Sequence, residues 1–343
     1  MGRTSRLSRA HRVRVGPLLV AGVLSLLVAA CSSGEPSAVA SRNRPGAPSP
    51  AGSPVSAAGA LAPLTGAPAS APGSQDRPIA AVPIRAQDGA PLPQGLLQAD
   101  IVYVEYAEPG LRRMLSLFAS QVPAVVGPVG GARPADRDIL RVANPLYVFS
   151  SSYKRFAEQI GGTADLASVT SSSAPPAFRT EADAESYALL PFVYQTLAGG
   201  RPAALPLLTH AEGVESLGTV GVAPATSLTV AVPGHAAQTW RYDPGTSSWM
   251  EGSGLTAQNV VVQRVDYKDT VTDKSGHTVP SARVVGDGAM QTFAGPTTVA
   301  GSWHKPRVEA LTNYVDGRTV PVRFAAGRTV ILLVPPLTSM TVS

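Results

Sequence analysis

The stretch Asp100–Tyr106, Asp-Ile-Val-Tyr-Val-Glu-Tyr, decides the fold that we expect for this chain. It is an unbroken run of β-branched and aromatic residues, which indicates a buried strand. Because side chains alternate between the two faces of a strand, Tyr103 and Glu105 share one face and Val102 and Val104 the other. The sequence therefore predicts a buried strand that carries Glu105 on the face opposite its two valines.

The rest of the N-terminal half is predicted to contain both strands and helices. Pro134 suits the first turn of a helix, whereas Pro191 is expected to kink the helix that contains it. Pro83 breaks the first strand of the half. The predicted strands are 79–84, 114–120 and 146–150, and the predicted helices are 134–143, 153–160 and 181–198.

After about residue 220, short β-branched runs recur with turn dipeptides such as Pro244-Gly245 and Asp287-Gly288 between them. This pattern is typical of an antiparallel β domain. The runs are 228–232, 238–242, 259–267, 282–285, 290–293, 297–303, 320–324 and 329–334. We place the boundary in the loosened chain at 201–222, which gives a mixed α/β domain at 77–205 and a β-rich domain at 206–343. The expected fold class is α+β.

Residues 1–30 have the pattern of a secretory signal peptide. Five arginines precede an apolar stretch of about fifteen residues, which is too short to span a bilayer. Small side chains at 28–30 stand directly before Cys31, the only cysteine of the chain. A lipoprotein signal peptidase needs small side chains before its cut and a thiol after it. We therefore expect export, lipidation of Cys31 and anchoring to the extracytoplasmic face of the cell membrane.

Cleavage before Cys31 changes the charge of the chain. The full chain has 28 basic and 23 acidic residues, and five of the basic ones lie before Cys31, which leaves 23 against 23. The apparent basicity thus gives no reason to expect a nucleic-acid partner. Residues 31–76 are rich in Ala, Pro, Ser and Gly and contain no aromatic residue, which predicts a disordered tether between the anchor and the folded part.

Several short blocks resemble the YerB-like bacterial lipoproteins. These blocks are 98–103 (Gln-Ala-Asp-Ile-Val-Tyr), 126–129 (Val-Gly-Pro-Val), 132–134 (Ala-Arg-Pro), 259–263 (Asn-Val-Val-Val-Gln), 286–288 (Gly-Asp-Gly) and 301–305 (Gly-Ser-Trp-His-Lys). The resemblance covers most of 77–336. It implies a lipid anchor, an α/β domain followed by a β domain, and no established activity.

The chain departs from that family at three polar positions. The family usually has a second arginine in the block that here reads Gly130-Gly131-Ala132-Arg133, and an Asp-Asn pair where this chain has Ile84-Arg85-Ala86-Gln87. It also has a His-Asn pair in the region 187–191, which is missing here. If these groups form a site in relatives, this chain has lost part of it.

Motifs of known chemistry are scarce. The histidines after Cys31, at 210, 235, 277 and 304, lack metal-ligand spacing, so neither a metal nor a cofactor is expected. Ser151-Ser152-Tyr153-Lys154 fits the S-x-x-K motif of penicillin-recognising enzymes, in which the lysine activates the serine. Lys274-Ser275-Gly276 imitates their K-T-G element. The intervening S-x-N element is missing and Lys274 lies in an expected hairpin tip, which favours a chance match.

Charged residues around the early strands form a better candidate site. The glycine-containing turn at 127–131 runs into the helix that begins at Pro134, and free N–H groups there would suit a carboxylate or phosphate. The alternative is that the same residues form structural ion pairs between strand ends and the helix. The candidates are Glu105, Glu108, Arg112, Arg113 and Arg133.

Trp303-His304-Lys305, at the end of a predicted strand, is a second candidate contact surface. The alternative is a tryptophan that caps the β core between solvated neighbours. Taken together, the sequence favours a non-catalytic binding or scaffold lipoprotein whose partner is an envelope protein or an anionic cell-wall ligand. The alternative is a cell-wall hydrolase or transferase that uses Glu105 or Glu108 as acid or base.

Overall fold

The main sheet is built around the stretch at 100–106, which forms most of strand β2 (Ile101–Glu108) in the computed structural model of the chain. β2 pairs antiparallel with β3 (Leu111–Phe118) on one side and parallel with β19 (Thr329–Val334) on the other. A strand that is covered on both faces can be largely apolar because neither face meets water. The structure describes residues 59–150, 166–182, 184–211, 217, 221–272 and 278–343.

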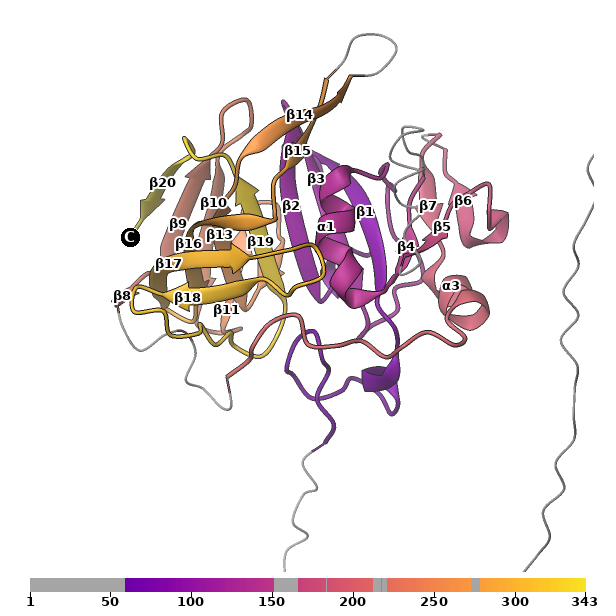
Figure 1. The fold of residues 1–343 in the computed structure, drawn as a ribbon, viewed down its shortest axis with the longest axis horizontal. Helices are drawn as coiled ribbons and strands as arrows, with labels where there is room; N and C mark the ends of the chain where they lie inside the picture. The colour runs from indigo at the N-terminus through magenta and orange to yellow at the C-terminus, as the bar shows by residue number, and fades with distance from the viewer. Residues whose placement is uncertain (1–58, 151–165, 183, 212–216, 218–220, 273–277) are drawn as a thin grey trace, which may run out of the picture. The chain divides into compact units, whose positions relative to one another are not determined.

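The strands of the main sheet come from both halves of the sequence (Figure 1). In spatial order they are β18 (Asn313–Asp316), β17 (Thr297–Lys305), β16 (Gly286–Ala294), β13 (Asn259–Arg264), β19, β2, β3, β1 (Ala80–Gln87), β4 (Leu146–Val148) and β5 (Ala167–Val169), with β8 (Val222–Pro224) also paired to β17. The predicted boundary at 205/206 thus separates two sets of strands that share one sheet. They join where β19 lies between β13 and β2.

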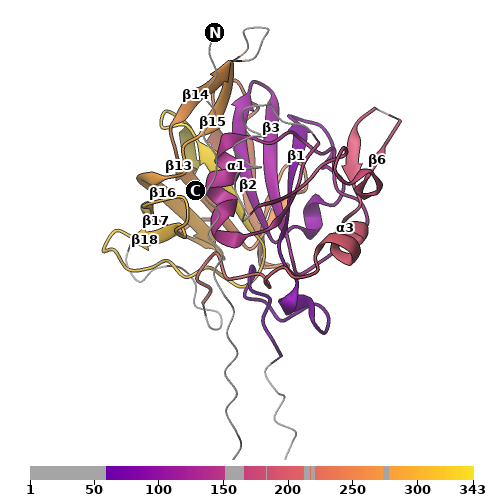
Figure 2. The same cartoon turned by 45° about the vertical axis from the view of Figure 1, so that its right-hand side comes forward.

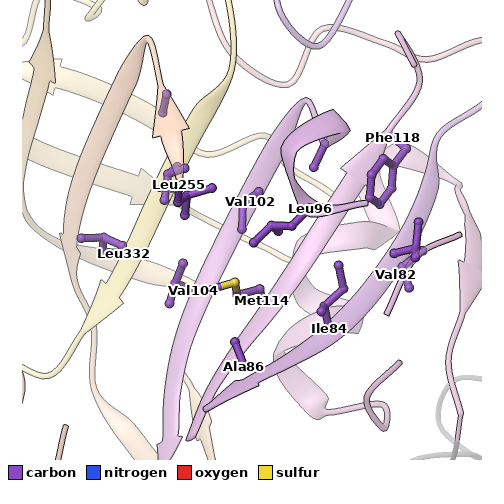
Figure 3. Close-up of a cluster of buried hydrophobic side chains, with 14 of the residues drawn as sticks. Val82, Ile84, Ala86, Leu96, Val102, Val104, Met114, Phe118, Leu255 and Leu332 are labelled. Carbon is purple, nitrogen blue, oxygen red and sulfur yellow. The ribbon is translucent and has the colours of Figure 1, made fainter. Parts of the chain in front are cut away.

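Hydrophobic side chains are buried on both faces of this sheet. Along β19, Ile331 and Leu333 belong to one core cluster, and Val330 and Leu332 belong to the other. Figure 3 shows part of the second cluster, in which Leu332, Val104 and Met114 come from neighbouring strands of the sheet. The strand period of two therefore creates two separate cores, one for each covering layer.

One face is covered by a second sheet of five strands. Trp249 of this sheet is fully buried, and its ring centroid lies 5.4 Å from that of Phe293 on β16. Its indole N–H donates to Gly295 O at 3.0 Å. The sheet order is β12 (Thr256–Ala257), β11 (Ser248–Glu251), β10 (Gln238–Asp243), β9 (Ser227–Ala231) and β20 (Ser339–Val342). These two sheets pack face to face around tryptophan and valine side chains.

The other face carries the helix α1 (Pro134–Leu140), which lies across β1, β2 and β3 (Figures 1 and 2). The hairpin of β14 (Tyr267–Thr272) and β15 (Thr278–Ala282) also lies on this face, since β15 contacts both β2 and α1. Short 3-10 helices complete the described part at Ser74–Asp76, Leu96–Gln98, Arg141–Ala143 and Pro175–Ala177.

The described part is predominantly β, so the expected α+β class holds only loosely. Its α-helices are both short, α1 and α3 (Leu190–Leu197). The helix expected at 181–198 is wrong in its first half, because β7 (Ser186–Ala188) pairs with β6 (Phe178–Thr180) there. Pro191 lies in the first turn of α3 instead of kinking a longer helix, because an N–H in the first turn has no intrahelical partner to lose. The helix expected at 153–160 lies outside the described residues.

The C-terminal half is also less regular than predicted. β19 pairs in parallel with β13 and β2, so this half is not purely antiparallel. The run 320–324 forms isolated bridges in place of a strand, through Val315–Pro321 and His210–Phe324. Of the run 282–285, only Ala282 belongs to a strand.

Candidate functional site

Three charged residues form a row across the centre of the main sheet. Arg113 on β3 lies directly opposite Arg85 on β1 and Glu105 on β2. Directly opposed side chains on one face of a sheet are close enough to interact. The row lies on the face covered by α1, so the sheet brings together Glu105 and Arg113 from the set expected to form a site.

Arg113 is the centre of a buried ion cluster. Its guanidinium donates to Asp136 on α1, with Nη1–Oδ1 and Nη2–Oδ2 distances of 2.7 and 2.5 Å. It also donates to Gly131 O at 2.8 Å and lies 3.4 Å from Glu105 Oε2. Tyr147 on β4 donates its hydroxyl to Asp136. Two parallel N–H···O bonds to one carboxylate are the strongest geometry available to arginine, so Asp136 is its main partner.

Glu105 interacts more weakly with Arg113 than Asp136 does. The carboxyl group is fully buried, and its Oε1 has no hydrogen-bond partner among the described residues. Burial raises the pKa of Glu105 to about 7, against the opposing attraction of Arg113, and nearby Asp136 adds to the rise. One guanidinium cannot balance two buried carboxylates, which favours the protonated form of Glu105.

The start of α1 is already occupied by protein groups. The N–H of Arg133 donates to Asp136 Oδ2 at 2.8 Å, and the N–H of Ala135 donates to Ser281 Oγ at 3.1 Å. The Arg133 side chain pairs with Glu108, with Nη2–Oε1 at 2.6 Å, and Glu108 is about half exposed. The free N–H groups expected to bind an anion at this turn are thus used by side chains of the chain itself.

Arg112 does not join this cluster, because neighbouring residues on a strand face opposite sides. Its Nε lies 2.9 Å from Asp88 Oδ1 and its Nη1 lies 3.8 Å from Glu251 Oε1. Asp88 also lies 3.3 Å from Nδ1 of His235 and accepts the N–H of Ala236 at 2.9 Å. This second cluster joins β3 to the five-stranded sheet.

The candidate surface at 303–305 is divided by the strand period. Trp303 is buried and donates its indole N–H to Arg264 O at 2.9 Å. Lys305 is also buried and donates to Ala310 O, and burial lowers its pKa. Only His304 is exposed, so the three residues do not form one contact surface.

One of the three departures from the family pattern, the block at 84–87, lines a cavity of about 320 Å³. Arg85, Gln87, Pro128 and Glu185 line it, and Arg85 forms an ion pair with Glu185. A side-chain Cβ placed on Gly130 would lie 3.2 Å from Arg85 Cγ. Positions far apart in the sequence therefore meet at the C-terminal end of β1, where this chain has an ion pair.

A larger groove of about 770 Å³ opens beside β18. Leu61, Leu208, His210, Leu311 and Phe324 are among its lining residues, and His304 also lines it. The described residues that line it include no Asp, Glu, Lys or Arg. The volume lies within the range of small-molecule sites, about 300–1,000 Å³. The expected site residues do not contribute to it, apart from His304.

Several expectations fall outside the described residues, namely Cys31, the signal peptide, the tether before residue 59, Ser151, Lys154 and Lys274. Within the described residues, no group of three or more His, Cys, Asp or Glu side chains is placed to hold a metal ion. None of the described helices is long and apolar enough to cross a membrane.

The expected set omitted the residues that complete both clusters, Asp136 and Tyr147 on one face and Asp88 and His235 on the other. Asp136 had a signal in the sequence, because an acidic residue three positions after a helix N-cap often binds back to the cap N–H. The other three reach their clusters through pairings of distant segments, which no local pattern indicates.

Comparisons with known proteins agree with this architecture. Residues 64–202 match the model described as "Protein of unknown function (DUF3048) N-terminal domain", and residues 228–331 match the corresponding C-terminal domain. The crystal structure of YerB protein from Bacillus subtilis is similar in fold, with a TM-score of 0.66 at 18% identity. That similarity covers 82% of this chain and 99% of the YerB chain. No curated protein sequence matches the chain.

Proposed function

The chain belongs to the DUF3048 family, a two-domain family of unknown function, and we propose that it is a lipid-anchored binding module that acts outside the cytoplasm without catalysis of its own. The lipid anchor is carried by Cys31, and the ligand or partner comes from the cell envelope. The family name assigns no activity, so the proposal rests on the residues of this chain.

One observation carries the binding function: the candidate acids of the described part are already paired with arginines. Glu105 lies beside Arg113 and Glu108 beside Arg133. Hydrolysis of a glycoside requires two carboxyl groups that flank a bound substrate, about 5–10 Å apart. Glu105 is fully enclosed, and the described residues that line the groove beside β18 include no carboxylate. The arrangement supports holding a ligand and gives no support to acid–base chemistry on one.

Support for the anchor comes from the sequence around Cys31. Arginines, an apolar stretch and three small side chains precede the only cysteine in the order that a lipoprotein signal requires. A single acyl chain binds membranes only weakly, whereas a cysteine that carries several chains anchors stably. The chain after Cys31 has no other thiol that could accept a lipid.

The anchor is tested by metabolic labelling with an alkyne analogue of palmitate, followed by membrane fractionation. We expect wild-type protein to carry the label and to sediment with membranes. Cys31→Ser should lose the label, while the matched control Ser32→Ala should keep both properties. Equal labelling of Cys31→Ser and wild type would contradict the proposal.

The absence of catalysis is tested by incubating the purified protein with isolated cell-wall glycan and with a fluorescent penicillin. We expect no soluble products and no covalent labelling. Products that disappear in Glu108→Gln would overturn the non-catalytic function in favour of the carboxylate enzyme. A labelled band that disappears in Ser151→Ala would overturn it in favour of a serine acyl-enzyme.

A further inference from the structure

The groove beside β18 is lined by four separate segments of the chain, at 61–66, 206–210, 311–315 and 321–324, and by His304 on β17. Figure 1 shows β18 at this edge of the main sheet. Leu61 and Leu311 are exposed at 59% and 37%, whereas Leu208 and Phe324 are buried. The groove therefore presents apolar side chains from its open side to its floor.

Each of these four segments has backbone groups that are hydrogen-bonded within the protein. Phe324 N–H donates to Thr209 O at 2.8 Å, and Val322 N–H donates to Tyr314 O at 2.9 Å. Gly66 N–H donates to Ala62 O at 2.8 Å. A peptide strand that entered the groove would find these donors used. A hydrocarbon requires no hydrogen bonds, so paired walls are suited to it.

The aromatic floor shows the same separation of polar and apolar groups. Tyr314 and Phe324 pack edge to face with ring centroids 5.6 Å apart. The Tyr314 hydroxyl donates to Gln263 Oε1 at 2.8 Å. With its hydroxyl group bound to the core, Tyr314 contributes ring carbons to the groove.

A smaller space of about 20 Å³ lies next to the groove, and Leu207 and Leu208 line both. It reaches Tyr103 and Ile139, and the buried Lys305 also lines it. A space of this volume holds about one water molecule, so a ligand chain lies in the groove itself.

One polar group in the lining has no partner. His210 Nε2 is buried and makes no hydrogen bond among the described residues. The His210 ring packs on the backbone of Gly66, where an added Cβ would lie 2.5 Å from Cγ. A neutral imidazole can form one hydrogen bond with an ester or carboxyl oxygen, which an acylated ligand carries at the end of its chain.

The location of the groove in the sequence indicates where such a ligand comes from. Its wall at 61–66 follows the lipidated Cys31 by about 30 residues. A flexible chain of that length has a mean span of about 30 Å. Under the proposed function, the groove is thus held within reach of the membrane surface.

We propose that this groove binds one acyl chain of a membrane lipid. This proposal rests on the lipid-anchored function proposed above for the source of the ligand. The chemistry of the site, an uncharged apolar groove with one unpartnered imidazole nitrogen, does not depend on the anchor. A charged ligand would meet no counter-charge among the described residues of the lining, so the head group stays in solvent.

The test uses the chain from residue 31 onward with Cys31→Ser, so that no covalent lipid competes. The probe is dansyl-undecanoic acid, whose fluorescence rises in apolar surroundings. We expect saturable binding that a lysophospholipid displaces. In this background, Leu311→Asp and Leu61→Asp should each weaken binding by about tenfold or more, because they place a charge at the mouth of an apolar site.

The matched control is Leu337→Asp, since Leu337 is 92% exposed and does not line the groove. It should bind the probe like the parent chain, and all three variants should keep the parent melting temperature. Absence of probe binding, or unchanged binding in both mouth variants, would overturn the proposal. Displacement by an apolar peptide and not by the lysophospholipid would also overturn it. Loss of Cys31-dependent labelling with intact probe binding would overturn the anchor and leave the acyl-chain site.

Discussion

Arg112 and Arg113 are neighbours on β3, yet each is the centre of a different buried ion cluster. Arg113 binds Asp136 and lies near Glu105, all within 105–136, on the face covered by α1. Arg112 faces the other way and contacts Asp88 and Glu251, which belong to opposite halves of the sequence. The Arg113 cluster is local and tightly bonded, whereas the Arg112 cluster is dispersed and joins the two sheets.

The difference lies in how well each arginine is matched. Arg113 makes paired hydrogen bonds to one carboxylate and must share its charge with a second. Arg112 has one close carboxylate oxygen at 2.9 Å and one distant oxygen at 3.8 Å. Removal of one partner from a buried pair leaves an uncompensated charge, which costs more than the pair itself contributes. Substitution of Arg113 and substitution of Arg112 should therefore differ in the loss of folding stability and in the region that opens.

Arg113→Met should have the largest effect. It leaves Asp136 and Glu105 buried without a cation, and we expect the free energy of unfolding to fall by about 3–5 kcal/mol. Urea denaturation at pH 7 measures this loss. Hydrogen exchange should show faster opening of α1 than of the five-stranded sheet. A loss below that of Arg112→Met would reverse the comparison.

Glu105→Gln should remove a pH dependence of the free energy of unfolding. The pKa of Glu105 rises from its ordinary value of 4.5 to about 7 in the folded chain because the group is buried. Between these values the folded state binds more protons than the unfolded state, so stability should fall as the pH rises from about 4.5 to about 7. The contribution is on the order of 3 kcal/mol.

The measurement is urea denaturation of wild type and Glu105→Gln across that pH range. The control is Glu108→Gln, whose carboxyl group is half exposed and should leave the slope unchanged. A wild-type slope that persists in Glu105→Gln would show that Glu105 is ionised in the folded chain.

Arg112→Met should cost about 2 kcal/mol, which is typical for losing a charged partner in a buried hydrogen-bonded network. The expected effect is smaller than at Arg113 because Asp88 keeps the N–H of Ala236 and Glu251 keeps Ser253 N–H at 2.8 Å. Hydrogen exchange should quicken in β10 and β11 more than in α1. An equal increase of exchange in α1 and in β10 and β11 would refute the proposal that the Arg112 cluster joins the two sheets.

His235→Gln should give the smallest effect, with a pH dependence opposite in sign to that of Glu105. Burial lowers the pKa of His235 below its ordinary 6.5, against the attraction of Asp88. Below pH 6.5 the unfolded chain binds more protons at this residue than the folded chain does, so stability should fall with acidification. His235→Gln should flatten the acid limb, while His304→Gln, at an exposed site, should not.

The sequence predicted the centre of the fold better than its connections. The run at 100–106 is a strand, and Pro134 begins α1, because β-branched content and a first-turn proline act through the local backbone. The opposite faces of Tyr103 and Val104 follow from the strand period alone. The parallel pairing of β2 with β19 joins residues more than 200 positions apart, which no local pattern indicates.

For the candidate site, the sequence indicated which charged residues matter better than it indicated which of them lie together. Glu105 and Arg113 do meet, but Arg112 and Arg113 do not, as the same strand period already required. The groove was not predicted at all, because its walls come from four segments with no common motif. Charged side chains are conspicuous in a sequence, whereas an apolar lining is hard to distinguish from an ordinary core.

The central position of β19 determines when the main sheet can form during synthesis and folding. At least 328 residues must be synthesised before the strand that joins β13 to β2 exists. Until then, β2 and β13 each expose a long apolar edge, the kind of surface that invites mispairing with other chains. A factor that covers those two edges until β19 pairs with both strands would therefore reduce mispairing.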